Sequence, residues 1–280
     1  MPNGLRPVAG RSGEEDNTSV SASWRSLVPL AMRRRKLPRP PKHRNGGGRA
    51  PDYVGIGVQR AGTTRWDSLI RSHPDAAPIV DWRGRLLKET HWFNDQRFDA
   101  TPAHAQAYAA WFQAPEDKVV GEFTPRYLYD RWPLDQLRSY YPDVKLLVLL
   151  REPVSRLASA LRFYEQIGIA LDEATVDECI DRGVYGPQLE YLFSIWPREQ
   201  VLVLLHEDCN ERPHEMLSQT YQFLGLDADF VPETIDTVSN ASTQLDVDQG
   251  VLHRAALIYE RDHQRLSNVL PNTDLSSWGG

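Results

Sequence analysis

The segment GVQRAGTTRW, residues 57–66, has the composition of an anion-binding loop that leads into a helix. Backbone N–H groups in such a loop, together with the positive end of the helix dipole, can bind a phosphate or sulfate. Thr63 stands where the ATPase pattern GxxxxGK[ST] has its lysine, and Arg60 supplies a cation from within the loop instead. The alternative is a glycine-containing turn with a surface arginine.

A second candidate anion site is the segment LREPVSRLASA, residues 150–160. Arg151 follows the most apolar run of the chain, and Ser155 and Ser159 are four apart, hence on one face of the predicted helix. A guanidinium and a hydroxyl at this position suit a phosphate group. The alternative is an ordinary salt bridge for Arg151 and a packing role for Ser159.

Candidate acid–base residues lie in the segment LLKETHWFND, residues 86–95. Glu89 can act as a general base on a hydroxyl group, and Lys88 or His91 can stabilise charge that develops during a reaction. His91 is also a candidate for contacting the substrate. The alternative is a polar loop in which His91 has a purely structural hydrogen bond.

The segment GEFTPRYLYD, residues 121–130, adds two further candidates for substrate contact. Glu122 ends a predicted strand, and Arg126 follows it closely enough to reach the same cleft. A salt-bridge role for Glu122 is equally compatible with the sequence.

Four aromatic residues, Trp82, Trp92, Phe93 and Trp111, are candidates for a platform beneath a sugar or another ring. The alternative is that they belong to the hydrophobic core.

The elements that must position these residues alternate along the chain. Apolar runs predict strands at residues 53–58, 118–122, 144–150 and 200–208. Periodic apolar residues predict helices at 63–73, 134–142, 153–164, 187–197, 213–226 and 251–270. This alternation predicts an α/β fold with a P-loop-type, mainly parallel sheet flanked by helices in a single domain. Ligands of such sheets bind at the carboxyl ends of the strands.

Charge is unevenly distributed over the 280 residues. Residues 1–50 contain eleven Lys/Arg and three Asp/Glu, a net charge of +8, and are rich in Pro and Gly. The remaining 21 Lys/Arg and 35 Asp/Glu give residues 51–280 a net charge of −14. We therefore predict a disordered basic arm at 1–50 and a folded domain at 51–280. A solvated arm without a nucleic-acid partner is expected, and the alternative is contact of the arm with a nucleic acid or an acidic membrane.

Two cysteines, Cys179 and Cys209, do not form a disulfide framework, and they have no Cys or His partners at metal-ligand spacing. No run of 18 apolar residues is present, so no transmembrane helix is expected. These features predict a cytoplasmic protein without a metal site.

Five segments, in order, resemble those of sulfotransferases that use 3′-phosphoadenylyl sulfate (PAPS), above all the carbohydrate, heparan-sulfate-like branch. GVQRAGTT is similar to the family's loop for the 5′-phosphosulfate, REPVSRLASA to its 3′-phosphate element and KETHWF to its KExHFF segment. GEFTPRYLYD and the stretch from Gly183 to Asp208 are similar to the segments that follow those motifs. The resemblance implies transfer of a sulfuryl group from PAPS to a hydroxyl of a carbohydrate, glycolipid or small natural product, without a metal.

The resemblance also implies roles for individual residues. Glu89 would be the catalytic base, and Arg60 and Lys88 would assist it by stabilising charge. The 5′-phosphosulfate would be held by Arg60, Ala61, Gly62, Thr63 and Thr64, and the 3′-phosphate by Arg151 and Ser159.

The sequence departs from the family at two places. Phe123 stands where heparan-type relatives often have a lysine, and Lys88 or Arg126 are the candidates to replace that charge. The late stretch 238–250 lacks the Lys and Arg that relatives have in a loop over the nucleotide. Two alternative functions remain: a P-loop nucleotide kinase, which would need a Walker lysine and a magnesium-binding aspartate, and a non-catalytic nucleotide-binding protein of the same fold.

Overall fold

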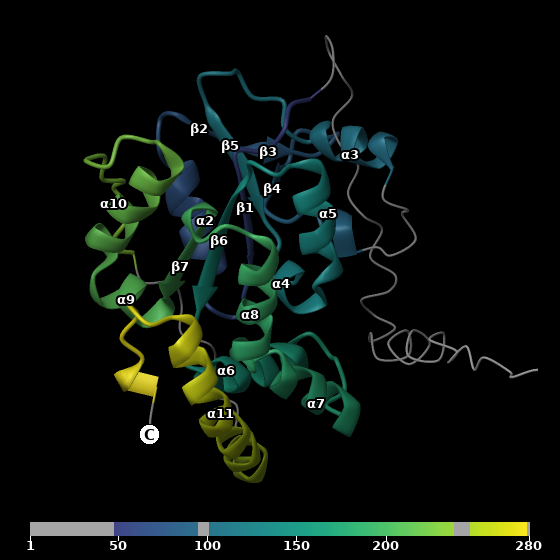
Figure 1. Ribbon diagram of the computed structural model, residues 1–280, viewed down its shortest axis with the longest axis vertical. Helices are drawn as coiled ribbons and strands as arrows, with labels where there is room; N and C mark the ends of the chain where they lie inside the picture. Colours follow the sequence, from purple (N-terminus) through teal and green to yellow (C-terminus); the bar gives the residue numbers. More distant parts are fainter. Residues whose placement is uncertain (1–47, 95–100, 238–246, 279–280) are drawn as a thin grey trace, which may run out of the picture. The chain divides into compact units, whose positions relative to one another are not determined.

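Figure 1 shows a computed structural model of the chain, which describes residues 48–94, 101–237 and 247–278. All of the described residues belong to one compact unit. The predicted basic arm at 1–50 and the late loop at 238–250 lie largely outside the described residues. Within the described ranges no helix is both long and apolar enough to cross a membrane.

The core of the domain is a five-stranded parallel sheet, in the order β2-β5-β1-β6-β7. The strands are β1 (Tyr53–Gly57), β2 (Ala76–Ala77), β5 (Val119–Phe123), β6 (Lys145–Leu150) and β7 (Val201–Leu205). Every residue of β1 is buried, as expected for a central parallel strand covered on both faces. A separate antiparallel hairpin pairs β3 (Ile79–Val80) with β4 (Leu86–Leu87).

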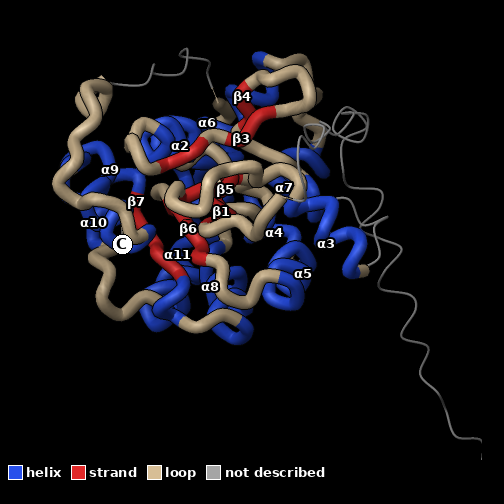
Figure 2. The backbone as a smooth tube through the Cα atoms, turned by 90° about the horizontal axis from the view of Figure 1, so that it is seen from above, coloured by secondary structure: helices blue, strands red, loops and turns tan. Residues whose placement is uncertain are grey.

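Helices cover both faces of the sheet (Figure 2). On one face, α2 (Thr63–Arg71) and α10 (Pro213–Leu224) contact each other and the strands (Figure 1). On the other face, α4 (Tyr127–Asp130) contacts β1, and α5 (Trp132–Tyr140) and α8 (Tyr185–Ile195) pack beside it. The predicted fold class, a mainly parallel sheet flanked by helices, is confirmed.

The remaining helices extend this frame. Those of α type are α3 (Pro102–Ala109), α6 (Pro153–Gln166), α7 (Glu173–Asp181), α9 (His206–Glu211) and α11 (Gln249–Val269). Short 3₁₀ helices occur at η2 (Trp92–Asn94), η3 (Arg198–Gln200) and η4 (Ser276–Trp278). Helix α11 packs against α6 and α8.

The end of β7 differs from the sequence prediction, which extended this strand to Asp208. The strand ends at Leu205, and His206 begins α9 instead. The physical reason is composition: the apolar run VLVLL stops there, and the polar residues that follow begin a helix at the protein surface. His206 thereby lies at the carboxyl edge of the sheet.

Candidate active site

The loop between β1 and α2 has the geometry of an anion site. Gly62 is the N-cap of α2, with a φ of 81°, and it has no side chain with which to cap the helix. The first intrahelical bond runs from the Trp66 N–H to the Gly62 carbonyl at 3.1 Å. The first four N–H groups of any α-helix precede such a bond, so they are available to an anion placed at the helix end.

Arg60, Arg151 and Ser159 come together beside this loop. Arg60 Nε donates a hydrogen bond to Ser159 Oγ at 3.1 Å, and Arg151 Nη1 donates one to the Arg60 carbonyl at 3.0 Å. Burial, and then the charge of Arg151, lower the pKa of Arg60. The two partly buried guanidinium groups repel each other, and a bound anion would relieve that repulsion.

Glu89 lies between two cationic side chains. Lys88 Nζ is 2.8 Å from Glu89 Oε1, and His91 Nε2 is 2.9 Å from Glu89 Oε2. Burial acts to raise the pKa of Glu89, but the His91 hydrogen bond and the Lys88 charge outweigh it and lower the pKa to about 2. Glu89 is therefore a carboxylate at neutral pH.

The hydrogen bonds of His91 indicate an imidazolium. Its Nδ1 lies 3.1 Å from Asn94 Oδ1, and the Asn94 amide is oriented because Nδ2 donates to Asp130 Oδ2 at 2.7 Å. Both ring nitrogens thus face acceptors, so each carries a proton. Burial lowers the pKa of His91, but the bond to Glu89 raises it by more, and the net pKa is raised.

Lys88 connects the base to the loop. Its Nζ donates to Thr63 Oγ1 at 3.0 Å while it pairs with Glu89. The same ammonium lies 5.7 Å from the ring centroid of Phe123. Phe123 is fully buried, and its ring occupies the space where a Cβ on Gly55 would be. That Lys88 or Arg126 replaces the charge of a lysine at position 123 stays a prediction.

Glu122 is at odds with the predicted substrate contact. Its carboxylate is fully buried and accepts hydrogen bonds from the Thr90 N–H and hydroxyl and from the hydroxyls of Thr124, Tyr108 and Tyr127. Five donors occupy the acceptor positions of a carboxylate, which leaves none for a ligand. Glu122 instead fixes the backbone of Thr90, the neighbour of the candidate base.

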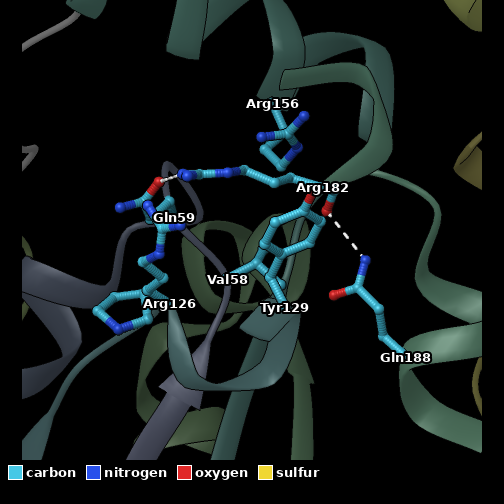
Figure 3. Close-up of a pocket in the computed structure, with 8 residues that line it drawn as sticks. Val58, Gln59, Arg126, Tyr129, Arg156, Arg182 and Gln188 are labelled. Atoms are coloured by element: carbon cyan, nitrogen blue, oxygen red, sulfur yellow. Dashed lines mark hydrogen bonds between the residues drawn. The ribbon is translucent and has the colours of Figure 1, made fainter. Parts of the chain in front are cut away.

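Arg126 belongs to an ion-pair network behind the loop. It pairs with Asp130 at 2.8 Å and with Glu178 at 3.6 Å, and Arg182 bonds both Glu178 and the Gln59 side chain. Gln59, Arg126 and Arg182 are among the residues that line a cavity of ≈ 10 Å³ (Figure 3), roughly the space of one water molecule. This cavity is too small to hold an acceptor molecule. The proposed contact between Arg126 and the substrate stays a prediction.

The four aromatic residues do not form a common platform. Phe93 and Trp111 are buried in the core, whereas Trp82 is 50% exposed on the β3–β4 hairpin. Trp92 stacks on His104 with ring centroids 5.1 Å apart. The core alternative therefore holds for Phe93 and Trp111.

Of the loop residues, Ala61 and Thr63 are buried and Thr64 is exposed at the start of α2.

The sequence reasoning missed two contributors to the site. Asn94 orients His91, and His206 lies against Gly62 from the end of β7. The signal for His206 was the change from VLVLL to polar residues at the strand end.

The chain is similar to proteins known as sulfotransferases. A family model described as "Sulfotransferase domain" matches residues 50–249. The chain is 28% identical over 172 residues to membrane-associated sulfotransferase kil1 of Dictyostelium discoideum, covering 61% of this chain and 32% of that protein. It is 25% identical over 203 residues to human heparan sulfate glucosamine 3-O-sulfotransferase 3B1, covering 65% of this chain and 48% of that protein.

The chain thus spans between a third and a half of the length of these relatives. A solved sulfotransferase from Alicyclobacillus acidocaldarius has the same fold, with a TM-score of 0.66, 24% identity, and coverage of 82% of this chain and 98% of that one. The family model covers most of the residues that form the sheet and the site. The chain therefore belongs to the sulfotransferase domain family.

Proposed function

We propose that this protein transfers a sulfuryl group from PAPS to an acceptor hydroxyl, with Glu89 as the general base. The observation that carries the proposal is the position of Lys88. Its ammonium bonds Thr63 of the anion-binding loop and the Glu89 carboxylate at once, at 3.0 and 2.8 Å. A donor anion in the loop and a base for the acceptor would then be within reach of one cation.

The nucleotide of PAPS carries a phosphate group at each end, and the arginines supply positive charge for both groups. The uncapped end of α2, with Arg60, Gly62 and Thr63, suits a 5′-phosphosulfate. Arg151 and Ser159, which both bond Arg60, suit a 3′-phosphate. The adenosine between these groups would be held at both ends, which orients the sulfuryl group for reaction.

The proposed step is an in-line displacement at sulfur. The acceptor oxygen forms a bond to sulfur while the bond from sulfur to the bridging phosphate oxygen breaks. Glu89 takes the hydroxyl proton, and the electron pair stays on the phosphate of the departing adenosine 3′,5′-bisphosphate. Arg60 and the N–H groups at the start of α2 stabilise the charge that develops there.

The basicity of Glu89 sets a condition on this step. A pKa of about 2 is low for a base, since general bases work best with a pKa near the operating pH. An anionic donor would draw Lys88 away from Glu89 and toward the sulfuryl group. Loss of that partner raises the pKa of the carboxylate, so donor binding itself would activate the base.

The acceptor class rests on the relatives. The human relative is named for sulfation of heparan sulfate glucosamine, and a mouse relative, 22% identical, is named carbohydrate sulfotransferase 15. We propose a carbohydrate hydroxyl as the first acceptor to test, with glycolipids and small natural products next. The cytoplasmic location stays a prediction, and the kil1 relative is named as membrane-associated.

The test uses the full chain, PAPS and a panel of hydroxyl acceptors. Product masses would show the addition of one sulfuryl group, and adenosine 3′,5′-bisphosphate would form in equal amount. Binding of the bisphosphate is measured in parallel, with and without EDTA. Tight binding without transfer to any acceptor would favour a non-catalytic protein. Binding of Mg-ATP in preference to the bisphosphate would favour a kinase.

A further inference from the structure

His206 contacts the anion-binding loop from the end of β7, the strand next to the one that Arg151 follows. As the first residue of α9, it places Nδ1 at 3.2 Å from the backbone carbonyl of Ala61. A Cβ built on Gly62 would lie 2.8 Å from the same nitrogen, so the imidazole packs directly on the N-cap of α2. His206 is therefore a neighbour of the loop, although it has no part in the proposed transfer step.

A chain of hydrogen bonds fixes which nitrogen of His206 carries the proton. Arg65 Nη1 donates to Asn210 Oδ1 at 3.4 Å, which orients the Asn210 amide. Asn210 Nδ2 then faces His206 Nε2 at 3.0 Å and must be the donor. His206 Nε2 accepts, so the proton is on Nδ1 and is donated to the Ala61 carbonyl.

We propose that His206, held as the neutral Nδ1–H tautomer by Arg65 and Asn210, is a positioning residue for the anion-binding loop. That the loop binds the sulfuryl donor rests on the proposed function. That His206 holds the loop in place does not. Two successive loop carbonyls are held from outside: that of Arg60 by Arg151 and that of Ala61 by His206. With both carbonyls fixed, the N–H groups at the start of α2 keep one orientation.

The charges around His206 favour the neutral ring. Arg151 and Arg65 are the cations that face it, and Glu207 is the neighbouring anion. Burial, and then the charge of Arg151, lower the pKa of His206. The ring therefore stays neutral at neutral pH, and Nδ1 remains its single donor. A prearranged loop binds an anion without first losing the conformational freedom of its own backbone.

The test compares three variants of the full chain. His206→Leu removes the hydrogen-bond donor to the Ala61 carbonyl, whereas His206→Asn keeps an N–H close to the position of Nδ1. His253→Asn, at an exposed position on α11, is the control. The readouts are the dissociation constant for adenosine 3′,5′-bisphosphate, hydrogen exchange of the loop amides in the ligand-free protein, and the tautomer of His206 from ¹⁵N NMR.

We expect His206→Leu to weaken bisphosphate binding by about tenfold and to speed exchange of the loop amides, since one hydrogen bond and its alignment are lost. His206→Asn should stay within about twofold of wild type, on the same estimate of one hydrogen bond. The wild-type ring should show the Nδ1–H tautomer. An Nε2–H tautomer, or unchanged loop exchange in a folded His206→Leu protein, would overturn the proposal.

The two proposals fail separately. If the wild-type chain did not bind the bisphosphate, the proposed function would fall. The tautomer and the loop exchange are read without a ligand, so they would still decide whether His206 positions the loop. If His206→Leu did not fold, the tautomer of His206 in the wild-type protein would decide it.

Discussion

Arg151 donates a hydrogen bond from Nη1 to the backbone carbonyl of Arg60 at 3.0 Å, although the two residues are 91 positions apart. Arg60 follows β1 and Arg151 follows β6, and these strands are parallel neighbours in the sheet. The two predicted anion sites therefore lie at the same edge of the sheet.

The first prediction separates the two ends of the nucleotide. Arg151→Met should weaken binding of adenosine 3′,5′-bisphosphate by about 10- to 100-fold, because a hydrogen bond to a charged group contributes about 1.5–3 kcal/mol. Binding of adenosine 5′-phosphate, which lacks the 3′ group, should change much less. Calorimetry with both ligands measures the difference. Equal losses for both would move Arg151 away from the 3′-phosphate.

The second prediction concerns the base. Glu89→Gln should bind the bisphosphate as wild type does but lose about 10²- to 10⁴-fold in the rate of transfer, the usual contribution of a general base. Single-turnover measurements with PAPS and the best acceptor give this rate. Glu116→Gln, at an exposed position of the same domain, is the matched control and should keep full activity. Retained transfer in Glu89→Gln would exclude Glu89 from the role.

Much of the site was predictable because its parts are local in sequence. The loop before α2, Arg151 with the serine eight residues later, and the Lys88–Glu89–His91 segment each lie in one short stretch. Because the loop before α2 and Arg151 follow apolar strands of a parallel sheet, they must lie at the edge where the strands have their carboxyl ends. The contact between Arg60 and Arg151 agrees with that rule.

The burial of Glu122 was not predictable, because it depends on contacts distant in sequence. Tyr108, which donates to its carboxylate, belongs to α3, a helix that the sequence analysis did not predict. That helix has almost no amphipathic pattern, since residues 102–109 are mostly alanine and polar residues. The role of His206 was missed because residues 200–208 were assigned to one strand.

A third prediction concerns stability in acid. The pKa of Glu89 is about 2 in the folded protein and 4.5 in its ordinary state, so the folded state favours the ionised form. This contribution is complete above about pH 4.5 and is lost as the pH falls toward 2, where both states bind the proton. The stability difference between wild type and Glu89→Gln should therefore shrink across that range.

Urea unfolding at a series of pH values measures this difference. His91→Leu is the matched control, because it removes the hydrogen bond that does most to lower the pKa of Glu89. Its own unfolding should respond less to pH in the same range. A constant difference between wild type and Glu89→Gln from pH 5 to the lowest pH of folding would contradict the ionic environment of Glu89.

A fourth prediction tests the place of Glu122. Glu122→Gln puts an amide donor among five donors from Thr90, Thr124, Tyr108 and Tyr127, so a buried polar group must lose its partner. The free energy of unfolding should fall by about 1–3 kcal/mol, the cost of an unsatisfied buried group. Tyr127→Phe removes one donor and leaves the carboxylate four, so its loss should be smaller.

The kinetic constants of the folded Glu122→Gln protein distinguish support from substrate contact. A residue that only fixes Thr90 should affect the rate of transfer through the position of Glu89 and leave the acceptor KM near the wild-type value. A residue that binds the acceptor should raise KM without loss of stability. If Glu122→Gln had wild-type stability and a raised acceptor KM, a substrate contact for Glu122 would be supported again. Wild-type stability would mean that the buried hydroxyl groups do not need the Glu122 carboxylate as their acceptor.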